Sequence, residues 1–141
     1  MIVYTHSLEG IAPEHLTGFF VDWGWPQPPS TQTHLKLLRN SAEIVLAIDD
    51  RHGNVVGYIT AITDGVLSAY IPLLEVLKPY QGRGVGSELM RRMLDRLSHL
   101  YMIDLLCDAD GQPFYERLGM RPAIGMFIRN YDRQSGPPQP E

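Results

Sequence analysis

A glycine-rich segment, Gln81-Gly82-Arg83-Gly84-Val85-Gly86, contains the residue types and spacing that point most directly to chemistry. Glycine lacks a β-carbon, so a ligand can approach the backbone closely and φ can be positive. An apolar run ends at Leu77 just before the segment, and an amphipathic helical pattern begins near Gly84. The free N–H groups of the first helical turn and the positive end of the helix dipole would then favour a phosphate or pyrophosphate.

Other interpretations of this loop can be tested on the sequence. A P-loop requires Gly-Lys-Ser/Thr, whereas this loop continues Val85-Gly86-Ser87 without a lysine. A Rossmann fingerprint has a third glycine where Ser87 stands and an acidic residue about twenty positions later. Asp104 meets the second condition, but too little chain follows for the further strand–helix units of a dinucleotide-binding fold. A glycine-rich turn that binds nothing remains an alternative on the loop alone.

The composition is that of an ordinary globular domain. The chain has 141 residues, enough for one domain with its own core, and 44% of them are hydrophobic. A net charge of −4 argues against a nucleic-acid partner. No apolar run is long enough to cross a bilayer, and no signal peptide is visible. The single Cys107 cannot form an internal disulfide. We therefore expect a cytoplasmic protein with no nucleic acid and no membrane as partner.

Apolar periodicity and turn residues predict a regular series of elements around the loop. Strands are expected at residues 2–5, 43–49, 55–63, within 66–77, and at 102–107 and 123–130. Helices are expected at residues 13–20, from a Ser30 cap to about 39, from about 84 to 100, and at 112–118. This order predicts a single-domain α+β fold over residues 1–133, with a central mixed, mostly antiparallel sheet and helices on both faces. A disordered tail is expected at residues 134–141.

Two segments together resemble one family. Residues 74–89, Leu-Glu-Val-Leu-Lys-Pro-Tyr-Gln-Gly-Arg-Gly-Val-Gly-Ser-Glu-Leu, resemble the acyl-CoA motif of the GNAT superfamily of acetyl-CoA-dependent N-acetyltransferases. Gln81, Gly84 and Gly86 occupy the defining positions of its Gln/Arg-x-x-Gly-x-Gly/Ala pattern. Residues 114–120, Phe-Tyr-Glu-Arg-Leu-Gly-Met, resemble the family's Phe-Tyr-x-x-x-Gly-Phe segment. The resemblance is close from about residue 43 to about residue 130, and the first forty residues match in pattern only.

The resemblance implies a GNAT-like fold and acetyl-CoA as co-substrate, with no metal. The strand at Leu74, Glu75 and Val76 would expose its backbone to the pantetheine arm of the cofactor. Backbone N–H groups of the loop would hold the pyrophosphate. Asp108 stands where many members carry asparagine, so an amide hydrogen bond there would be altered. The implied cofactor-binding residues are Leu74, Val76, Gln81, Gly82, Arg83, Gly84, Val85, Gly86, Ser87 and Asp108.

The resemblance implies one catalytic residue, Tyr115, and the apolar surroundings of Glu75 suggest a second; each has an alternative explanation. Tyr115 would be the general acid that protonates the departing thiolate, but a half-buried tyrosine at this position could simply pack the short helix. Glu75 is the one carboxylate inside a long apolar run, where burial would raise its pKa toward that of a general base. It could instead be a charge at a strand end that reaches water. Tyr70, earlier in the same apolar run, could orient a water.

These residues predict an N-acetyltransferase that transfers the acetyl group to a primary amine of a small molecule or peptide by direct attack. The alternative is a catalytically inactive acyl-CoA-binding or regulatory module. Trp23 and Trp25, in a proline-rich segment, could form a lid over the acceptor, anchor the fold or make a dimer contact, and a homodimer is left open. The acceptor pocket is built from loops, so the sequence does not name the amine.

Overall fold

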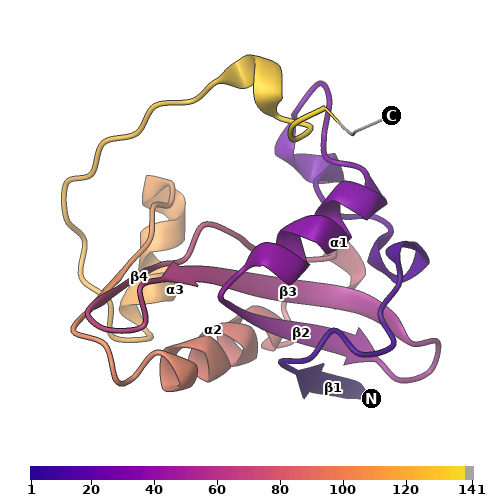
Figure 1. Cartoon of the computed structure of the whole chain (residues 1–141). Helices are drawn as coiled ribbons and strands as arrows, with labels where there is room; N and C mark the ends of the chain where they lie inside the picture. The colour runs from indigo at the N-terminus through magenta and orange to yellow at the C-terminus, as the bar shows by residue number, and fades with distance from the viewer. Residues whose placement is uncertain (139–141) are drawn as a thin grey trace.

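A six-stranded sheet forms the centre of the molecule in the computed structural model, which describes residues 1–138 (Figure 1). The strand order is β1-β2-β3-β4-β6, and β5 also pairs with β3. All pairs are antiparallel except β4 with β6. The strands are β1 (Ile2–Thr5), β2 (Glu43–Asp49), β3 (Asn54–Thr63), β4 (Ser68–Tyr70), β5 (Leu74–Val76) and β6 (Met102–Asp104). The predicted mixed, mostly antiparallel sheet is confirmed.

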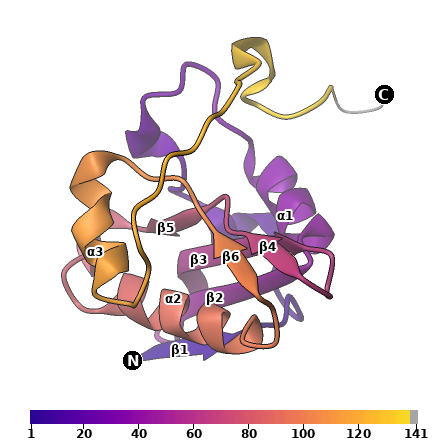
Figure 2. The same cartoon turned by 90° about the vertical axis from the view of Figure 1, so that its left-hand side faces the viewer.

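Helices cover both faces of this sheet, as predicted (Figures 1 and 2). The helix α1 (Thr31–Asn40) lies on one face, and its Ser30 cap accepts a hydrogen bond from the Thr33 amide at 3.1 Å. The helices α2 (Val85–Arg96) and α3 (Gln112–Glu116) lie on the other face. Within residues 1–138, five short 3₁₀ turns complete the fold, at Pro13–Leu16, Val21–Trp23, Lys78–Tyr80, Ala109–Gly111 and Tyr131–Arg133.

Strand β3 is buried on both faces, which explains its continuous apolar sequence. Val55 and Tyr58 pack on the α1 side, whereas Val56 and Ile59 pack on the α2 side. Gly57 also faces α2, because a β-carbon there would lie 3.0 Å from a methyl group of Leu89. The glycine therefore allows α2 to pack closely against the centre of the sheet.

The apolar run at residues 66–77 forms two strands that pair with different parts of β3. Tyr70 of β4 pairs opposite Ile62, whereas Val76 of β5 pairs opposite Gly57. Pro72 lies between the two strands and has no N–H to offer a ladder. Strand β6 continues the sheet from β4 and not from β5. The sheet therefore opens between β5 and β6.

Three predicted elements differ in the structure. The helix expected at residues 13–20 is only a short 3₁₀ turn at Pro13–Leu16, because Thr17 is extended, with φ −72° and ψ 139°, and Gly18 and Phe20 then take positive φ values of 102° and 69°. The strand expected at 102–107 ends at Asp104. The strand expected at 123–130 is wrong: these residues form no ladder and are exposed, because the chain here arches away from the sheet (Figure 1).

The predicted tail is described only in part. Residues 134–138 continue beyond the last 3₁₀ turn, and residues 139–141 lie outside the described residues. Gly136 lies against α1, because a β-carbon there would be 3.0 Å from Thr33 Cγ2.

Candidate active site

The glycine loop leads directly into α2, as the sequence predicts. Gly82 and Gly84 have φ values of 75° and 81°, in the left-handed region that favours glycine. The first helical hydrogen bond runs from the Glu88 amide to the Gly84 carbonyl at 3.0 Å. The amides of Val85, Gly86 and Ser87 therefore precede the helical ladder and have no acceptor within the helix. This turn offers N–H donors and the positive end of the helix dipole to an anion.

The loop is joined to the end of β5 by side-chain contacts. Gln81 Nε2 donates to the Val76 carbonyl at 2.9 Å. A β-carbon on Gly86 would lie 3.7 Å from a Val76 methyl group and 3.6 Å from the Phe114 ring. Alanine would fit at Gly86, but a larger side chain would displace one of these neighbours. The helix α2, strand β5 and helix α3 thus meet at Gly86.

The free edge of β5 faces the opening in the sheet. The Leu77 amide donates to the Val56 carbonyl, and the Thr60 amide donates to the Leu73 carbonyl. In an antiparallel ladder every second residue bonds to the neighbouring strand, and the residues that alternate with them direct their N–H and C=O groups to the opposite edge. On this strand Leu73, Glu75 and Leu77 face β3. Leu74 and Val76 therefore present backbone groups toward the gap between β5 and β6.

A buried carboxylate that the sequence analysis did not single out holds the start of the loop. Asp49, at the end of β2, has a side chain only 1% exposed. It accepts hydrogen bonds from Arg51 Nε at 3.0 Å and from Tyr80 Oη at 2.7 Å. These bonds, that from Arg51 first, hold the pKa of Asp49 well below its usual range. Tyr80 immediately precedes Gln81, so this contact joins the start of the loop to the end of β2.

The arginine side chains near the loop differ in whether they form an ion pair within the protein. Arg91 and Arg92 pair with Glu88, and Arg96 Nε lies 2.6 Å from Glu43 Oε2. These three arginines of α2 therefore have partners within the protein. Arg83 makes no ion pair within residues 1–138, and its guanidinium lies 5.3 Å from the centre of the Tyr80 ring.

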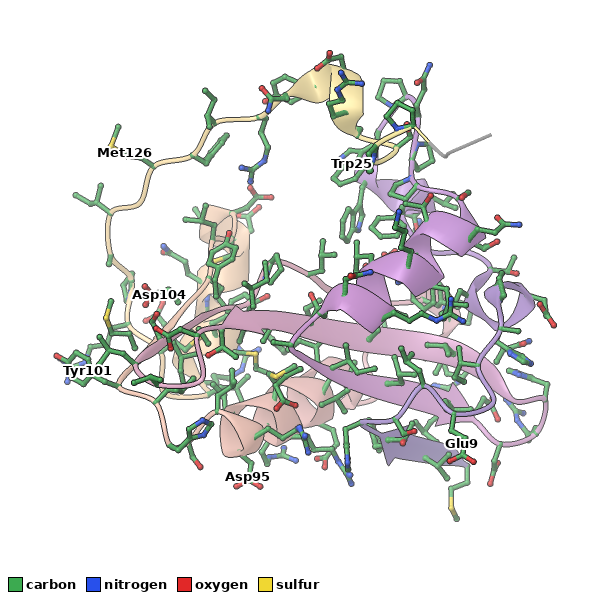
Figure 3. All side chains as sticks on the ribbon, viewed as in Figure 1. Glu9, Trp25, Asp95, Tyr101, Asp104 and Met126 are labelled. Atoms are coloured by element: carbon green, nitrogen blue, oxygen red, sulfur yellow. The ribbon has the colours of Figure 1, made fainter. Side chains whose placement is uncertain are left out.

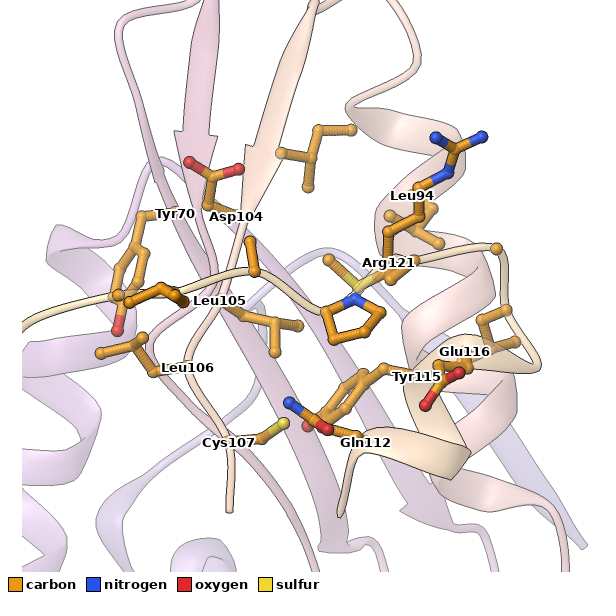
Figure 4. A pocket seen from close by; sticks show the side chains of 18 of the residues that line it. Tyr70, Leu94, Asp104, Leu105, Leu106, Cys107, Gln112, Tyr115, Glu116 and Arg121 are labelled. Atoms are coloured by element: carbon orange, nitrogen blue, oxygen red, sulfur yellow. The ribbon is translucent and has the colours of Figure 1, made fainter. Parts of the chain in front are cut away.

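A cavity of about 860 Å³ occupies the opening between β5 and β6. A second cavity, of about 690 Å³, adjoins it between β6, α3 and the chain that follows α3 (Figure 4). Both cavities are lined by Tyr70, Leu106, Cys107 and Tyr115. The first is also lined by Trp23, Trp25, Leu74 and Asp108. The structure therefore brings three of the predicted site residues, Leu74, Asp108 and Tyr115, to one cavity.

Tyr115 projects from α3 into this space and toward Cys107 (Figure 4). The side chain is half-buried, and burial, followed by the nearby Cys107 thiol, raises its pKa. Gly111 separates the two residues, because a β-carbon there would lie 3.5 Å from Cys107 Cβ and 3.9 Å from the Tyr115 ring. The phenol is thus protonated at neutral pH and available as a donor. The proximity of Cys107 arises from the α3 turn and has no signal in the sequence.

Glu75 lies on the opposite side of β5 from Leu74 and does not line either cavity. Both of its carboxylate oxygens lie 3.1 Å from the Phe20 amide, which donates to them. Burial, reinforced by the Asp22 charge, raises its pKa to about 7 despite this hydrogen bond. The structure therefore separates the two predicted catalytic residues.

The aromatic residues of the N-terminal loop link Glu75 to the cavity. The Phe20 ring packs edge-on against Trp23 at 4.9 Å and stacks on Trp25 at 5.8 Å. Both tryptophans also line the cavity of Tyr115. They therefore line the cavity and pack against the core, so they help to anchor the fold, while a lid over an acceptor stays a prediction.

Two further observations concern metal ions and the membrane. Within residues 1–138, no three histidine, cysteine or acidic side chains gather in a way that could hold a metal ion. None of the helices in that part of the chain has the length and apolar character required to cross a bilayer.

Comparison with known proteins agrees with this geometry. Residues 8–120 match the acetyltransferase (GNAT) family. A crystal structure of a candidate acetyltransferase from Deinococcus radiodurans R1 is 49% identical, with a TM-score of 0.93 over 98% of this chain and 94% of that one. A GNAT family acetyltransferase from Streptococcus pneumoniae TIGR4 is 28% identical, with a TM-score of 0.74 over 92% and 98% of the two chains.

A sequence relative gives the same result. The uncharacterized N-acetyltransferase ycf52 of Pyropia yezoensis is 25% identical in an alignment of 138 positions, which covers 95% of this chain and 75% of the relative. The family match covers both the glycine loop and the segment around Tyr115. The chain belongs to the GNAT family of acetyltransferases.

Proposed function

We propose that this protein is an N-acetyltransferase that uses acetyl-CoA and transfers its acetyl group to a primary amine of a small molecule or peptide. The main support for the proposal is that three features follow one another in the structure: the helix-start amides, the free edge of β5 and the cavity of Tyr115. The free amides of Val85, Gly86 and Ser87 adjoin the end of β5, and the free edge of β5 leads to the cavity of Tyr115. A pyrophosphate, an extended amide-containing arm and a thioester follow one another in acetyl-CoA in the same order.

Each part of the cofactor has residues to receive it. The loop from Gln81 to Ser87 would hold the pyrophosphate, with Arg83 adding positive charge. The backbone groups of Leu74 and Val76 would pair with the pantetheine amides as a neighbouring strand would. Asp108, at the rim of the cavity, would lie beside the thiol end of the cofactor.

The chemistry is a direct attack of a neutral amine on the thioester carbonyl carbon. The new C–N bond forms as the carbonyl becomes an oxyanion, which a free main-chain N–H at the cavity end of β5 would stabilise. The C–S bond then breaks, and the thiolate takes the phenolic proton of Tyr115. With reference pKa values of about 10 and about 8.5, that transfer costs roughly 2 kcal/mol, which is small beside an acyl-transfer barrier. Glu75 would take the amine proton through water, because it does not line the cavity itself.

The test is release of CoA thiol from acetyl-CoA in the presence of a panel of small-molecule and peptide amines. We expect turnover with at least one primary amine and none without an acceptor. The alternative, a catalytically inactive acyl-CoA-binding module, predicts calorimetric binding of acetyl-CoA with no turnover on any amine. Failure to bind CoA at all would contradict both functions.

Substitution of Gly84 by alanine is expected to weaken CoA binding about tenfold. A side chain at φ 81° is strained by roughly 1–2 kcal/mol, and the loop would relax away from the geometry that aims its amides at the pyrophosphate. The measurement is the dissociation constant of CoA by calorimetry.

Gly10 provides a matched control for this substitution. Its φ is 79°, and a β-carbon there meets nothing within 4 Å, as at Gly84. Gly10→Ala should therefore carry a similar conformational strain and leave CoA affinity unchanged. Equal losses of affinity in the two variants would show that the effect is general destabilisation and would remove Gly84 from the binding site.

A further inference from the structure

The turn between β2 and β3 contributes side chains that meet the start of the glycine loop. Besides its bond to Asp49, the Tyr80 hydroxyl lies 3.3 Å from His52 Nε2. The Asn54 amide donates to His52 Nδ1 at 3.1 Å. Because a backbone amide can only donate, Nδ1 is the acceptor nitrogen, and Nε2 bears the hydrogen that points to Tyr80. An ordered series of hydrogen bonds, which we call the hydrogen-bond chain, therefore runs from the Asn54 amide to the Asp49 carboxylate.

The acceptor at the end of the hydrogen-bond chain is fixed in place by a positive charge. The Arg51 amide donates to Asp49 Oδ1 at 3.1 Å, and Arg51 Nε donates to the same oxygen at 3.0 Å. Donation to Asp49, followed by burial, raises the pKa of the Tyr80 hydroxyl. The phenol therefore keeps its proton at neutral pH. Because its acceptor is ionised, the bond from Tyr80 is the strongest side-chain contact that the loop makes with the turn.

The ring and the backbone of Tyr80 hold two other parts of the loop region. The Arg83 guanidinium lies 5.3 Å from the ring centre, where the negative face of the ring attracts a cation. The Tyr80 amide donates to the Leu77 carbonyl at 2.9 Å, so the chain turns from the end of β5 into the loop at this residue. Tyr80 therefore joins three parts: the turn between β2 and β3, the end of β5, and the arginine of the loop that has no ion pair within residues 1–138.

These contacts lie apart from the cavity of Tyr115. None of the residues of the hydrogen-bond chain lines either cavity. Figure 3 shows the turn between β2 and β3 at the opposite end of β3 from Tyr101 and Asp104, which line the adjoining cavity. An effect of the hydrogen-bond chain on the reaction must therefore act through the glycine loop, and not through the acetyl group or the amine.

We propose that Tyr80 is a positioning residue for the cofactor pyrophosphate: its hydroxyl, held by Asp49 and His52, orders the glycine loop before acetyl-CoA binds. Its ring orders the Arg83 guanidinium beside the same loop. Glycine residues lose more conformational freedom than other residues when they are ordered, and a loop that is ordered in advance does not subtract this cost from the binding free energy. The inference rests on the proposed function, because it requires that the loop binds CoA.

Tyr80→Phe removes the hydroxyl and keeps the ring. We expect the dissociation constant of CoA, measured by calorimetry, to rise about fivefold, because the loop loses its bond to a charged acceptor. The value of kcat at saturating acetyl-CoA should stay within about twofold, since the reacting groups are untouched. Tyr4→Phe is a matched control: Tyr4 also lies beneath an arginine, with Arg92 4.6 Å from its ring centre, but it belongs to β1. This control should leave both quantities unchanged.

A shorter thioester distinguishes positioning of the loop from general damage to the fold. S-Acetylpantetheine has the thioester and the amide arm of acetyl-CoA but no pyrophosphate. Tyr80→Phe should lower kcat/KM for acetyl-CoA about fivefold and leave kcat/KM for S-acetylpantetheine unchanged. Equal losses with the two thioesters would show that the variant damages the whole site, and they would overturn the positioning role.

Double variants test the order of the contacts. His52→Leu should weaken CoA binding about threefold in the unmodified protein and have no further effect in Tyr80→Phe, because His52 acts through the hydroxyl. Tyr80→Leu also removes the ring and should weaken binding about threefold more than Tyr80→Phe. That difference should vanish when Arg83 is replaced by alanine. Additive effects in either pair would overturn the proposed order of contacts.

The outcome for the unmodified protein separates this inference from the proposed function. A protein that does not bind CoA at all would overturn both. A protein that binds CoA, and whose Tyr80→Phe variant keeps that affinity within about twofold, would overturn the role of Tyr80 alone and leave the proposed function standing.

Discussion

Replacement of Tyr115 by phenylalanine is expected to lower kcat by about 100-fold or more and to leave the dissociation constant of CoA within about twofold. The phenol is the donor that the proposed reaction needs at the thiolate, and burial keeps it protonated. Phenylalanine preserves the ring that packs beside Phe114, where the two ring centres lie 4.9 Å apart. Packing is therefore retained, and only the proton donor is lost.

The measurement is steady-state turnover of acetyl-CoA with an accepted amine, combined with calorimetric binding of CoA. Tyr101→Phe is a matched control, because Tyr101 lines the adjoining cavity but is 85% exposed and has no part in the proposed chemistry. Unchanged turnover in Tyr115→Phe would remove Tyr115 from the mechanism and favour its role as a packing residue of α3. A parallel loss of CoA affinity would indicate that the hydroxyl contributes to binding instead.

The sequence predicts the cofactor side of this protein better than the acceptor side, for a physical reason. The loop from Gln81 to Gly86 depends on local requirements: positive φ at Gly82 and Gly84 and the free amides of a helix start. Such requirements are encoded in neighbouring residues and are visible as spacing. By contrast, the meeting of Trp25 with Tyr115 at one cavity joins residues ninety positions apart, through the opening of the sheet.

Two of the three errors in the predicted elements have the same origin. The sequence of residues 123–130 has strand composition, but a strand also needs an edge to pair with, and that edge is not set by the segment itself. The helix expected at 13–20 has suitable apolar spacing, but Phe20 adopts a φ of 69° while its amide donates to Glu75, fifty-five residues away. In both cases tertiary contacts override a local pattern.

Glu75→Gln is expected to remove the acidic limb of the pH profile of kcat/KM and to lower its plateau by about 100-fold. A general base acts only when it is deprotonated. With a pKa of about 7, Glu75 should make kcat/KM fall roughly tenfold per pH unit below pH 7 and level off above it. Glutamine keeps an oxygen that can accept from the Phe20 amide, so the contact that holds Phe20 is preserved. The measurement is kcat/KM from pH 5 to pH 9 for both proteins.

The thermal stability of the protein is an independent measure of the ionisation of Glu75, and it should depend on pH in the opposite direction to kcat/KM. The pKa of Glu75 is raised on folding, so the stability linked to its protonation is fully present below the unfolded value of about 4.3 and is lost as pH rises through about 7. Glutamine cannot ionise, and Glu75→Gln should therefore melt at the same temperature as the unmodified protein at pH 4 and at a higher temperature at pH 8. A Glu75→Gln variant could be more stable at pH 8 and still keep the full pH profile of kcat/KM. That result would confirm that burial raises the pKa of Glu75, but it would show that another group, or the solvent itself, removes the amine proton.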